Sequence, residues 1–214
     1  MARAAIFDMD GTIVDSDELA WTSSLEGLSA YWARRGLPPV FPDRPAVKAL
    51  VGLPSLEYFA GLLPLDRRGD AEEVRSLVGE SEVRRLAAGE GKVFPGMRET
   101  LADLRRRGWA LGLVSNCGRL YLSANVEHLR LGELFGVTCC LDDLPTKTEN
   151  VRAALTALGA REGVMVGDRR ADLEAGRANG LRTVACTYGF GADDELASAD
   201  ARIAAPRELL ALLP

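Results

Sequence analysis

The sequence contains little lysine and histidine, no long apolar run and no basic cluster. Only three of its 26 basic residues are lysines, Lys48, Lys92 and Lys147, and its one histidine is His128. With a net charge of −5 and no grouping of basic residues, neither nucleic acid nor an anionic membrane surface is expected as a partner. No stretch approaches the roughly 18 apolar residues of a membrane-spanning helix, so none is predicted. His128 lies in a predicted amphipathic helix, which favours a surface or packing role over catalysis.

The four cysteines do not follow the spacing of a disulfide framework or a zinc finger. Three of them, Cys139, Cys140 and Cys186, lie in apolar runs. The N-terminus also lacks the charged region and apolar segment of a signal peptide. We therefore expect all four, Cys117 included, to be reduced core thiols in a cytoplasmic protein.

A chain of 214 residues with 47% hydrophobic and 27% charged residues has a globular composition. Its length allows one large domain, or a domain with an inserted module, to bury a core without disulfides or metal. Between residues 15 and 91 the pattern contains no convincing strand. It predicts a helix over about 14–36, a proline-rich break at 38–45 and shorter helical pieces over 46–88.

Outside this segment, short apolar runs typical of buried strands alternate with helical patterns. Strands are predicted at 4–7, 109–114, 136–141, 163–166 and 182–187. Helices are predicted at 97–107, 119–131, 148–158, 171–179 and 207–213, with a loop over 192–202. The alternation predicts an α/β fold, a parallel sheet with helices on both faces, whose ligands bind beyond the carboxyl ends of the strands.

Two carboxylates, Asp8 and Asp10, end the first predicted strand and are followed by Gly11. In an extended chain their side chains project from the same face, where they repel unless a cation, a proton or hydrogen bonds relieve them. Alternatively, Asp and Gly merely open a turn. Polar residues at three further strand ends favour a functional site.

These other strand ends carry Ser115, Asn116, Lys147, Asp168 and Asp172. Asp8, Asp10 and Asp168 offer the oxygen ligands that Mg²⁺ prefers. Lys147 would add a compact positive charge on a phosphoryl group, to which Ser115 and Asn116 could donate hydrogen bonds. One carboxylate can then attack phosphorus, and a second can protonate the leaving oxygen and activate water. Each residue also has a structural reading, such as a turn for Ser115, a solvated loop for Lys147 or a helix-start acid for Asp172.

The run Phe7-Asp8-Met9-Asp10-Gly11-Thr12 closely resembles the first motif of the haloacid dehalogenase-like (HAD) hydrolase superfamily. Val114-Ser115-Asn116 resembles its second motif, Lys147 its third and Gly167-Asp168-Arg169-Arg170-Ala171-Asp172 its fourth. The motifs occur in the family's order, and the resemblance covers nearly the whole chain. One departure is that relatives usually follow the lysine with prolines, whereas this chain has Thr148, Glu149 and Asn150.

The resemblance implies a Rossmann-like core, residues 1–14 and 92–214, with an α-helical cap inserted at 15–91. It implies that Asp8 forms an aspartyl-phosphate and that Asp10 is the general acid and base. It further implies Mg²⁺ as cofactor, held by the Asp8 carboxylate, the Asp10 main-chain carbonyl and the Asp168 carboxylate, with Asp172 supporting this metal site. Ser115 and Lys147 complete the expected catalytic set, and Asn116 joins them in binding the substrate phosphate.

Within the superfamily, segments 51–56 and 93–96 look most like the phosphoglycolate phosphatase-like branch. The expected function is a Mg²⁺-dependent phosphatase acting on a small phosphorylated metabolite, phosphoglycolate or a sugar phosphate, as a monomer or homodimer. Arg44 and Lys48 are candidates for substrate recognition, with a surface role equally open.

Four alternatives remain. A β-phosphoglucomutase-like phosphomutase shares the core, but the histidine expected shortly after the first motif is absent. Dehalogenation needs no acid such as Asp10, and phosphonate hydrolysis would need an imine-forming cap lysine, for which Lys48 is the candidate. A non-catalytic HAD-like binding protein would be favoured by loss of Asp8 or Asp10, and both are present.

Overall fold

A computed structural model describes residues 2–214 and contains a six-stranded sheet in the order β3-β2-β1-β4-β5-β6. Every neighbouring pair of these strands is parallel. The strands are β1 (Ala2–Phe7), β2 (Trp109–Val114), β3 (Val137–Cys139), β4 (Ala160–Gly167), β5 (Arg182–Cys186) and β6 (Ala201–Ile203). The strand order reverses direction between β1 and β4, so the carboxyl ends of these two strands form the switch point at which such sheets bind ligands. The Rossmann-like fold is confirmed.

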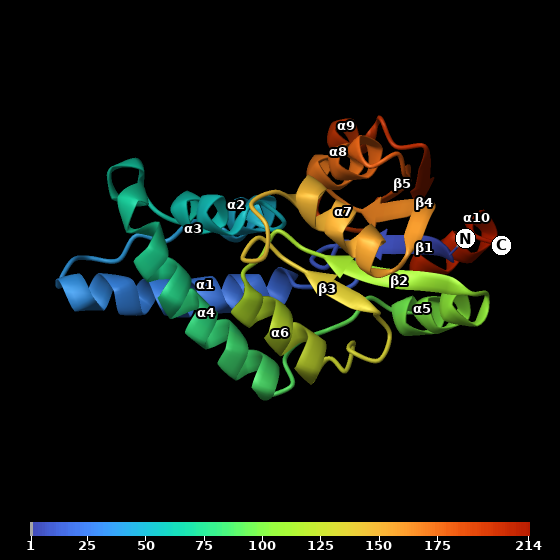
Figure 1. Ribbon diagram of the computed structural model, residues 1–214. Helices are drawn as coiled ribbons and strands as arrows, with labels where there is room; N and C mark the ends of the chain where they lie inside the picture. Colours follow the sequence, from blue (N-terminus) through green and yellow to red (C-terminus); the bar gives the residue numbers. More distant parts are fainter. Residues whose placement is uncertain (1) are drawn as a thin grey trace.

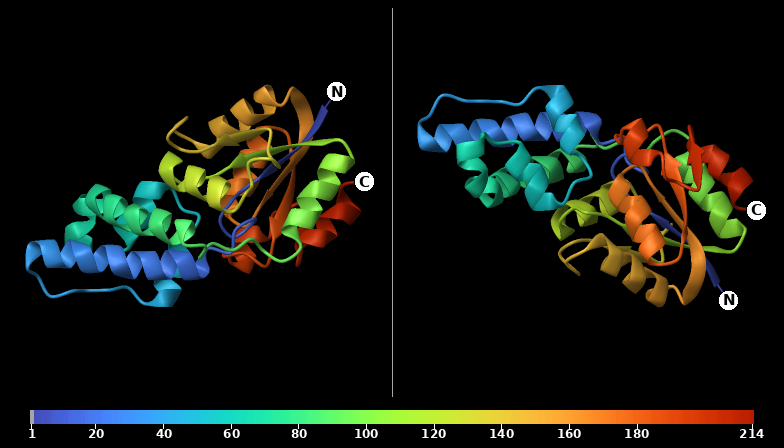
Figure 2. Two further views of the ribbon diagram at one scale, coloured as in Figure 1. Left: turned by 90° about the horizontal axis from the view of Figure 1, so that it is seen from below. Right: turned by 90° about the horizontal axis from the view of Figure 1, so that it is seen from above.

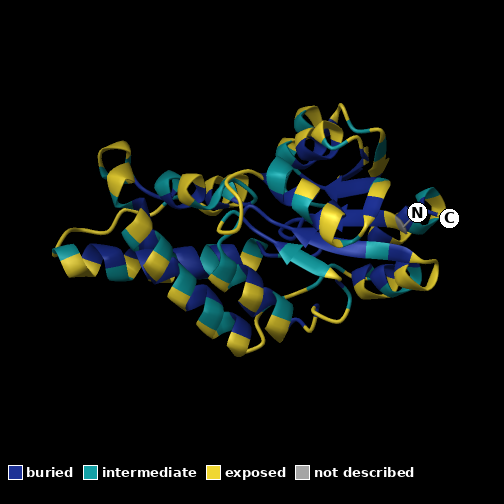
Figure 3. Cartoon of the chain, in the orientation of Figure 1, coloured by how far each residue is buried: buried dark blue, intermediate teal, exposed yellow. Residues whose placement is uncertain are grey.

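Helices cover both faces of the sheet (Figure 1). The alternation of side chains along β1 shows the two layers, because Ala5 and Phe7 belong to one apolar cluster and Ala4 and Ile6 to another. The first cluster includes residues of α5 (Met97–Arg106), α6 (Arg119–His128) and α10 (Leu209–Leu212), which follows the short helix η2 (Pro206–Glu208). The second includes residues of α7 (Lys147–Ala157) and α8 (Arg170–Ala178). The strands between these layers are largely buried (Figure 3).

Residues 15–91 form helices and loops with no strand, as the sequence predicts. We call residues 15–91 the inserted helical segment. Its helices are α1 (Asp17–Arg35), α2 (Arg44–Leu50), α3 (Ser55–Gly61), η1 (Leu65–Asp70) and α4 (Ala71–Ala87). Figure 2 shows α1 to α4 extending from one end of the sheet, and their buried residues, among them Leu28 and Val74, form a separate apolar cluster.

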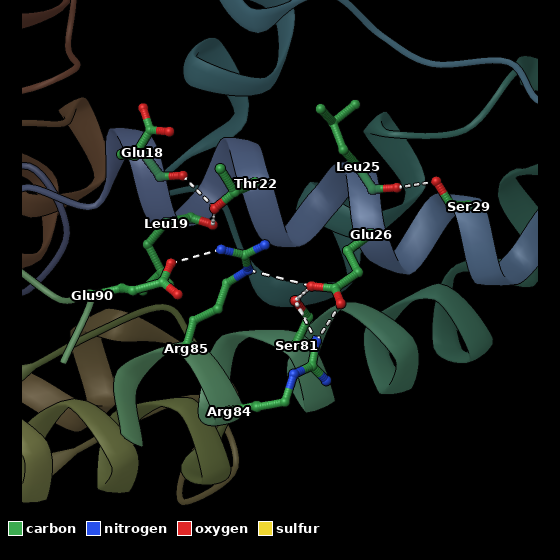
Figure 4. A network of polar contacts seen from close by, with 10 residues as sticks. All are labelled: Glu18, Leu19, Thr22, Leu25, Glu26, Ser29, Ser81, Arg84, Arg85 and Glu90. Carbon is green, nitrogen blue, oxygen red and sulfur yellow. Dashed lines mark hydrogen bonds and ion pairs between the residues drawn. The ribbon is translucent and has the colours of Figure 1, made fainter. Parts of the chain in front are cut away.

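Helices α1 and α4 pack closely against each other. A Cβ at Gly27 of α1 would lie 2.8 Å from the main-chain nitrogen and Cα of Val78 in α4, so only glycine allows this approach. Beside this contact, Glu26 accepts a 2.6 Å hydrogen bond from Ser81 and pairs with Arg84 and Arg85 (Figure 4). Exposed ion pairs add little stability. The backbone contact and the Ser81 bond therefore set the register of the two helices.

Two predictions of the chain pattern are wrong. The proline-rich break over 38–45 ends early, because α2 begins at Arg44 and has Pro45 in its first turn. The expected loop over 192–202 contains a short helix, α9 (Asp193–Leu196), and the edge strand β6. Strand β6 has three residues, of which only Ile203 is buried, so it is too short to show an alternating pattern in the sequence. The strand is held in place from its flank, where the Asp200 carboxylate accepts hydrogen bonds from the Thr183 amide at 2.7 Å and hydroxyl at 2.8 Å.

Among residues 2–214, no helix combines the length and hydropathy needed to cross a bilayer. His128 lies exposed at the end of α6, as expected. The cysteines are unpaired, and Cys139, Cys140 and Cys186 are buried, whereas Cys117 is only half-buried and is not a core thiol. The cytoplasmic location stays a prediction.

Candidate active site

The turn after β1 brings Asp8 and Asp10 to the carboxyl end of the sheet. The Asp8 amide donates a 2.9 Å hydrogen bond to the Val166 carbonyl of β4, which extends the pairing of the two strands to the first carboxylate. Gly11 then turns the chain with φ of +79°, and a Cβ there would lie 2.2 Å from Oδ2 of Asp168. Both its conformation and this close approach require glycine. Asp8 and Asp10 are 2% and 7% exposed, so neither is an ordinary solvated turn residue.

Lys147, the first residue of α7, contacts one carboxylate after β1 and another in the first turn of α8. Its Nζ donates a 2.6 Å hydrogen bond to Oδ1 of Asp8 and lies 2.5 Å from Oδ1 of Asp172. Burial alone would lower the pKa of Lys147, but the charges of Asp172 and Asp8 raise the pKa above its usual value. The ammonium group is therefore firmly charged, which excludes the solvated-loop reading.

The residues after Lys147, where relatives usually carry prolines, continue as helix α7 in this chain. Lys147 is the first residue of α7, and the Thr146 side chain caps this helix by accepting a 3.2 Å hydrogen bond from the Glu149 amide. The Thr146 hydroxyl also donates to the Glu149 carboxylate at 2.7 Å. This reciprocal cap fixes the start of α7 and so the position of the lysine.

Asp8, Asp168 and Asp172 offer carboxylate oxygens that all lie within 4.8 Å of one another, and all three residues are buried. Burial and the charge of Asp172 raise the pKa of Asp168 to about 7. Burial, opposed by Lys147, also raises the pKa of Asp8 above its usual range. Three carboxylates this close with one lysine lack a compensating charge, and their hard oxygen atoms are the donor set that a divalent cation takes. The cluster therefore fits a divalent metal.

The two carboxylates that follow β4 are individually oriented. Asp168 accepts hydrogen bonds from the Thr12 hydroxyl at 3.1 Å and the Phe190 amide at 2.7 Å. Asp172, in the first turn of α8, accepts a 2.9 Å hydrogen bond from the Arg169 amide through Oδ2, which leaves Oδ1 facing Lys147. Asp172 is thus tied into the cluster and is more than a helix-start acid.

The Asp10 side chain lies apart from these three carboxylates. It accepts a 2.9 Å hydrogen bond from the Tyr121 hydroxyl of α6 and lines a pocket. Burial raises the pKa of Asp10, although the Tyr121 hydrogen bond opposes this. Tyr121 was not expected from the sequence, because no motif marks a helix residue that reaches the first strand.

Ser115 and Asn116 follow β2 and are both buried. The Ser115 hydroxyl accepts a 3.3 Å hydrogen bond from the Cys117 amide. The Asn116 side-chain amide donates to the Gly52 carbonyl at 3.0 Å, and the Asn116 main-chain carbonyl accepts from the Ser55 amide at 3.1 Å. Asn116 thus fastens the inserted helical segment to the sheet.

A pocket of about 230 Å³ lies between the sheet end and the inserted helical segment. From the sheet side it is lined by Asp10, Ser115, Asn116, Cys117 and Tyr121, and from the inserted helical segment by Gly52, Leu53, Ser55, Tyr58, Arg75 and Glu82, among others. Arg44 and Lys48 are not among its lining residues. Arg44 pairs instead with Asp17 and Glu18, and Lys48 is exposed near the Phe190 ring. Glu82 and Arg75 are the charged pocket residues that sequence reasoning missed.

The chain is similar to known proteins over most of its length. The model of the haloacid dehalogenase-like hydrolase family matches residues 5–186. The phosphoglycolate phosphatase of Synechococcus elongatus is 32% identical over 216 residues, which cover 97% of this chain and 95% of the relative. The N-acetylmuramic acid 6-phosphate phosphatase of Pseudomonas putida is 28% identical over 193 residues, which cover 88% of this chain and 84% of the relative.

A solved structure supports the fold. CbbY from Rhodobacter sphaeroides, in complex with phosphate, matches with a TM-score of 0.81 at 23% identity, covering 100% of this chain and 99% of that one. The family model spans the first strand, the inserted helical segment and both acidic motifs. The chain therefore belongs to the haloacid dehalogenase-like hydrolase family and is a phosphatase.

Proposed function

We propose that the protein hydrolyses a small phosphate ester in a Mg²⁺-dependent reaction, with Asp8 as the nucleophile. The observation that carries this proposal is the position of Lys147, whose Nζ lies 2.6 Å from Asp8 and 2.5 Å from Asp172. A charged lysine beside one carboxylate of a three-carboxylate cluster can neutralise a phosphoryl group that approaches Asp8. Residues 15–91 would act as the cap over this site.

Asp8, Asp168 and the main-chain carbonyl of Asp10 would hold Mg²⁺, and Asp172 would support this site. The bound ion would supply positive charge that offsets the carboxylates and the phosphoryl oxygens. Ser115, Asn116 and Lys147 would hold the phosphate, Ser115 through its hydroxyl and Lys147 through its ammonium group. The Asn116 side-chain amide already donates one hydrogen bond to Gly52, so only its second amide hydrogen is free to bind the phosphate.

The chemical steps then follow from the positions of two carboxylates. An oxygen of Asp8 attacks phosphorus and forms the aspartyl-phosphate while the ester P–O bond breaks. The leaving alkoxide takes a proton from Asp10, whose raised pKa suits a general acid. Asp10 next takes a proton from water, the water oxygen bonds to phosphorus, and the Asp8–phosphorus bond breaks to release phosphate.

The substrate class proposed here is a small phosphorylated metabolite. Relatives named as phosphatases of phosphoglycolate and of N-acetylmuramic acid 6-phosphate support this class. Their names do not single out one substrate within it. The pocket of about 230 Å³ beside Asp10 has room for a small organic group.

Phosphate release from an aryl phosphate tests the proposal. We expect release that needs Mg²⁺ and that the Asp8→Asn variant lacks, because an amide cannot act as the nucleophile. The Asp66→Asn variant is the matched control, since the Asp66 side chain is 76% exposed and far along the chain from every motif. Activity that survives Asp8→Asn would contradict the mechanism. Isomerisation of a sugar phosphate without net phosphate release would identify a phosphomutase instead.

A further inference from the structure

Glu82 of α4 is a buried carboxyl group that lines the pocket without a partner. It is 7% exposed and faces the same pocket as Asp10. Among residues 2–214, no group donates a hydrogen bond to this carboxyl, and the one charged neighbour that acts on it is another acid, Asp10. Buried polar groups are normally hydrogen-bonded, so a lone carboxyl in a pocket points to a partner that arrives with a ligand.

Two tyrosine hydroxyl groups that line the pocket make their hydrogen bonds to other residues. The Tyr121 hydroxyl donates to Asp10 at 2.9 Å, and the Tyr58 hydroxyl shares a 2.8 Å hydrogen bond with Ser24. Burial and the charge of Asp10 raise the pKa of Glu82 to about 8. Neither tyrosine hydroxyl is therefore bonded to the Glu82 carboxyl.

Helix packing holds Glu82 in this position. Its neighbour Ser81 donates to Glu26 of α1 (Figure 4). The contact of Gly27 with Val78 lies one turn earlier on α4. This packing keeps the side of α4 that carries Glu82 toward the pocket. Its place in the pocket is built into the fold.

Arg75, a basic residue of the same helix that also lines the pocket, does not neutralise the charge of Glu82. Arg75 lies seven residues earlier, roughly 10 Å along the helix axis. Its guanidinium group lies 3.7 Å from both Glu72 and Asp142, and its side chain is 36% exposed. The pocket wall next to Asp10 is thus acidic through Glu82. The basic residue Arg75 lies at a more exposed part of the same wall.

We propose that Glu82 determines substrate specificity by accepting a hydrogen bond from a hydroxyl or ammonium group on the organic part of the phosphate ester. This inference rests on the proposed phosphatase function and narrows its substrate class to sugar, polyol or amino-alcohol phosphates. Above a pH of about 8, where Glu82 is ionised, a carboxylate at the same place, as in phosphoglycolate, would meet a second negative charge.

The test compares kcat/KM in Mg²⁺ at pH 9, where Glu82 is ionised, for sugar, polyol and amino-alcohol phosphates, phosphoglycolate and an aryl phosphate that has no donor. For the best donor substrate, Glu82→Gln should lower kcat/KM by about 10-fold and Glu82→Leu by about 100-fold, mainly through KM. Both variants should hydrolyse the aryl phosphate within about 3-fold of the wild type and should gain activity on phosphoglycolate. Comparing hydroxyl with ammonium substrates identifies the donor.

Glu80→Gln is the matched control, because Glu80 lies on the same helix, is exposed and does not line the pocket. The inference is overturned if the wild type prefers phosphoglycolate or hydrolyses only the aryl phosphate. It is also overturned if both Glu82 variants keep the substrate selectivity of the wild type. Absence of phosphate release from every ester, the aryl phosphate included, would instead remove the proposed function itself.

Discussion

The Arg169 guanidinium donates a 2.7 Å hydrogen bond to the main-chain carbonyl of Val51, so a residue of the acidic motif after β4 holds a loop of the inserted helical segment. The same group donates to the Ala49 carbonyl at 3.2 Å, while its Nε bonds to Glu195 at 3.1 Å. Arg169 directly follows Asp168. The carboxylate cluster and the loop beside the pocket are therefore linked through a single side chain.

Replacing Arg169 by methionine should loosen this loop over the pocket. We expect KM for a phosphate ester to rise and kcat/KM to fall about 10-fold, since two hydrogen bonds from a charged donor are lost at roughly 1–2 kcal/mol in total. Arg169→Lys should restore little, because lysine has one nitrogen and cannot bond to the loop carbonyls and to Glu195 from two separate nitrogens, as Nη1 and Nε of Arg169 do. Arg170→Met is the control, since Arg170 is exposed. Unchanged KM in Arg169→Met would refute this role.

Replacing Lys147 by methionine should destabilise the protein. The change leaves Asp8 and Asp172 buried without their shared cation, and removal of one partner of a buried ion pair costs about 3–5 kcal/mol. The measurement is the free energy of unfolding in urea at pH 8 without Mg²⁺. Added Mg²⁺ should restore part of the loss. A change below about 1 kcal/mol would mean that the carboxyl groups are protonated and need no lysine.

The sequence predicted the sheet and most of the acidic site, because both leave local patterns. Each buried strand is a short apolar run, and the polar residues directly after it share one edge in any parallel sheet. Asp8 and Asp168 directly follow β1 and β4, Lys147 and Asp172 lie in the first turns of the helices that come after β3 and β4, and the structure brings the four together. Their metal and catalytic roles stay predictions.

The residues missed by the sequence depend on contacts between distant segments. Tyr121 reaches Asp10 across 111 positions and Arg169 reaches Val51 across 118. Glu82 reads as an ordinary charged residue of an amphipathic helix, and only the packing of α4 reveals that it is buried. Edge strand β6 is defined by its pairing with β5 and the Asp200 hydrogen bonds to Thr183, which have no local signature.

Mg²⁺ should raise the melting temperature, and its affinity should depend on pH. Because burial and Asp172 raise the pKa of Asp168 to about 7, protons compete with the metal below that pH. We expect the dissociation constant from calorimetry to weaken up to about 10-fold per pH unit between pH 7 and 6 and to be nearly constant above pH 8. Asp168→Asn should abolish the thermal shift, while Asp66→Asn should keep it. A pH-independent constant would contradict the prediction.

Glu82 should make the protein less stable as the pH rises. Its pKa is raised to about 8 in the folded state by burial and by Asp10, against an ordinary value near 4.5. The folded state thus keeps a proton that the unfolded chain has lost, so the stability contribution of this group is lost as the pH rises from about 4.5 to 8. For one proton the slope is about 1.4 kcal/mol per pH unit.

The Glu82→Gln variant cannot titrate and should lack this slope. Between pH 5.5 and 7.5 the free energy of unfolding of the wild type should fall by about 2–3 kcal/mol relative to the variant, measured in urea at each pH. Other buried acids titrate in both proteins, so the difference isolates Glu82. Glu80→Gln should follow the wild type, since Glu80 is exposed. Parallel curves for the wild type and Glu82→Gln would show that the Glu82 carboxyl is ionised in the folded protein, and hence solvated or paired.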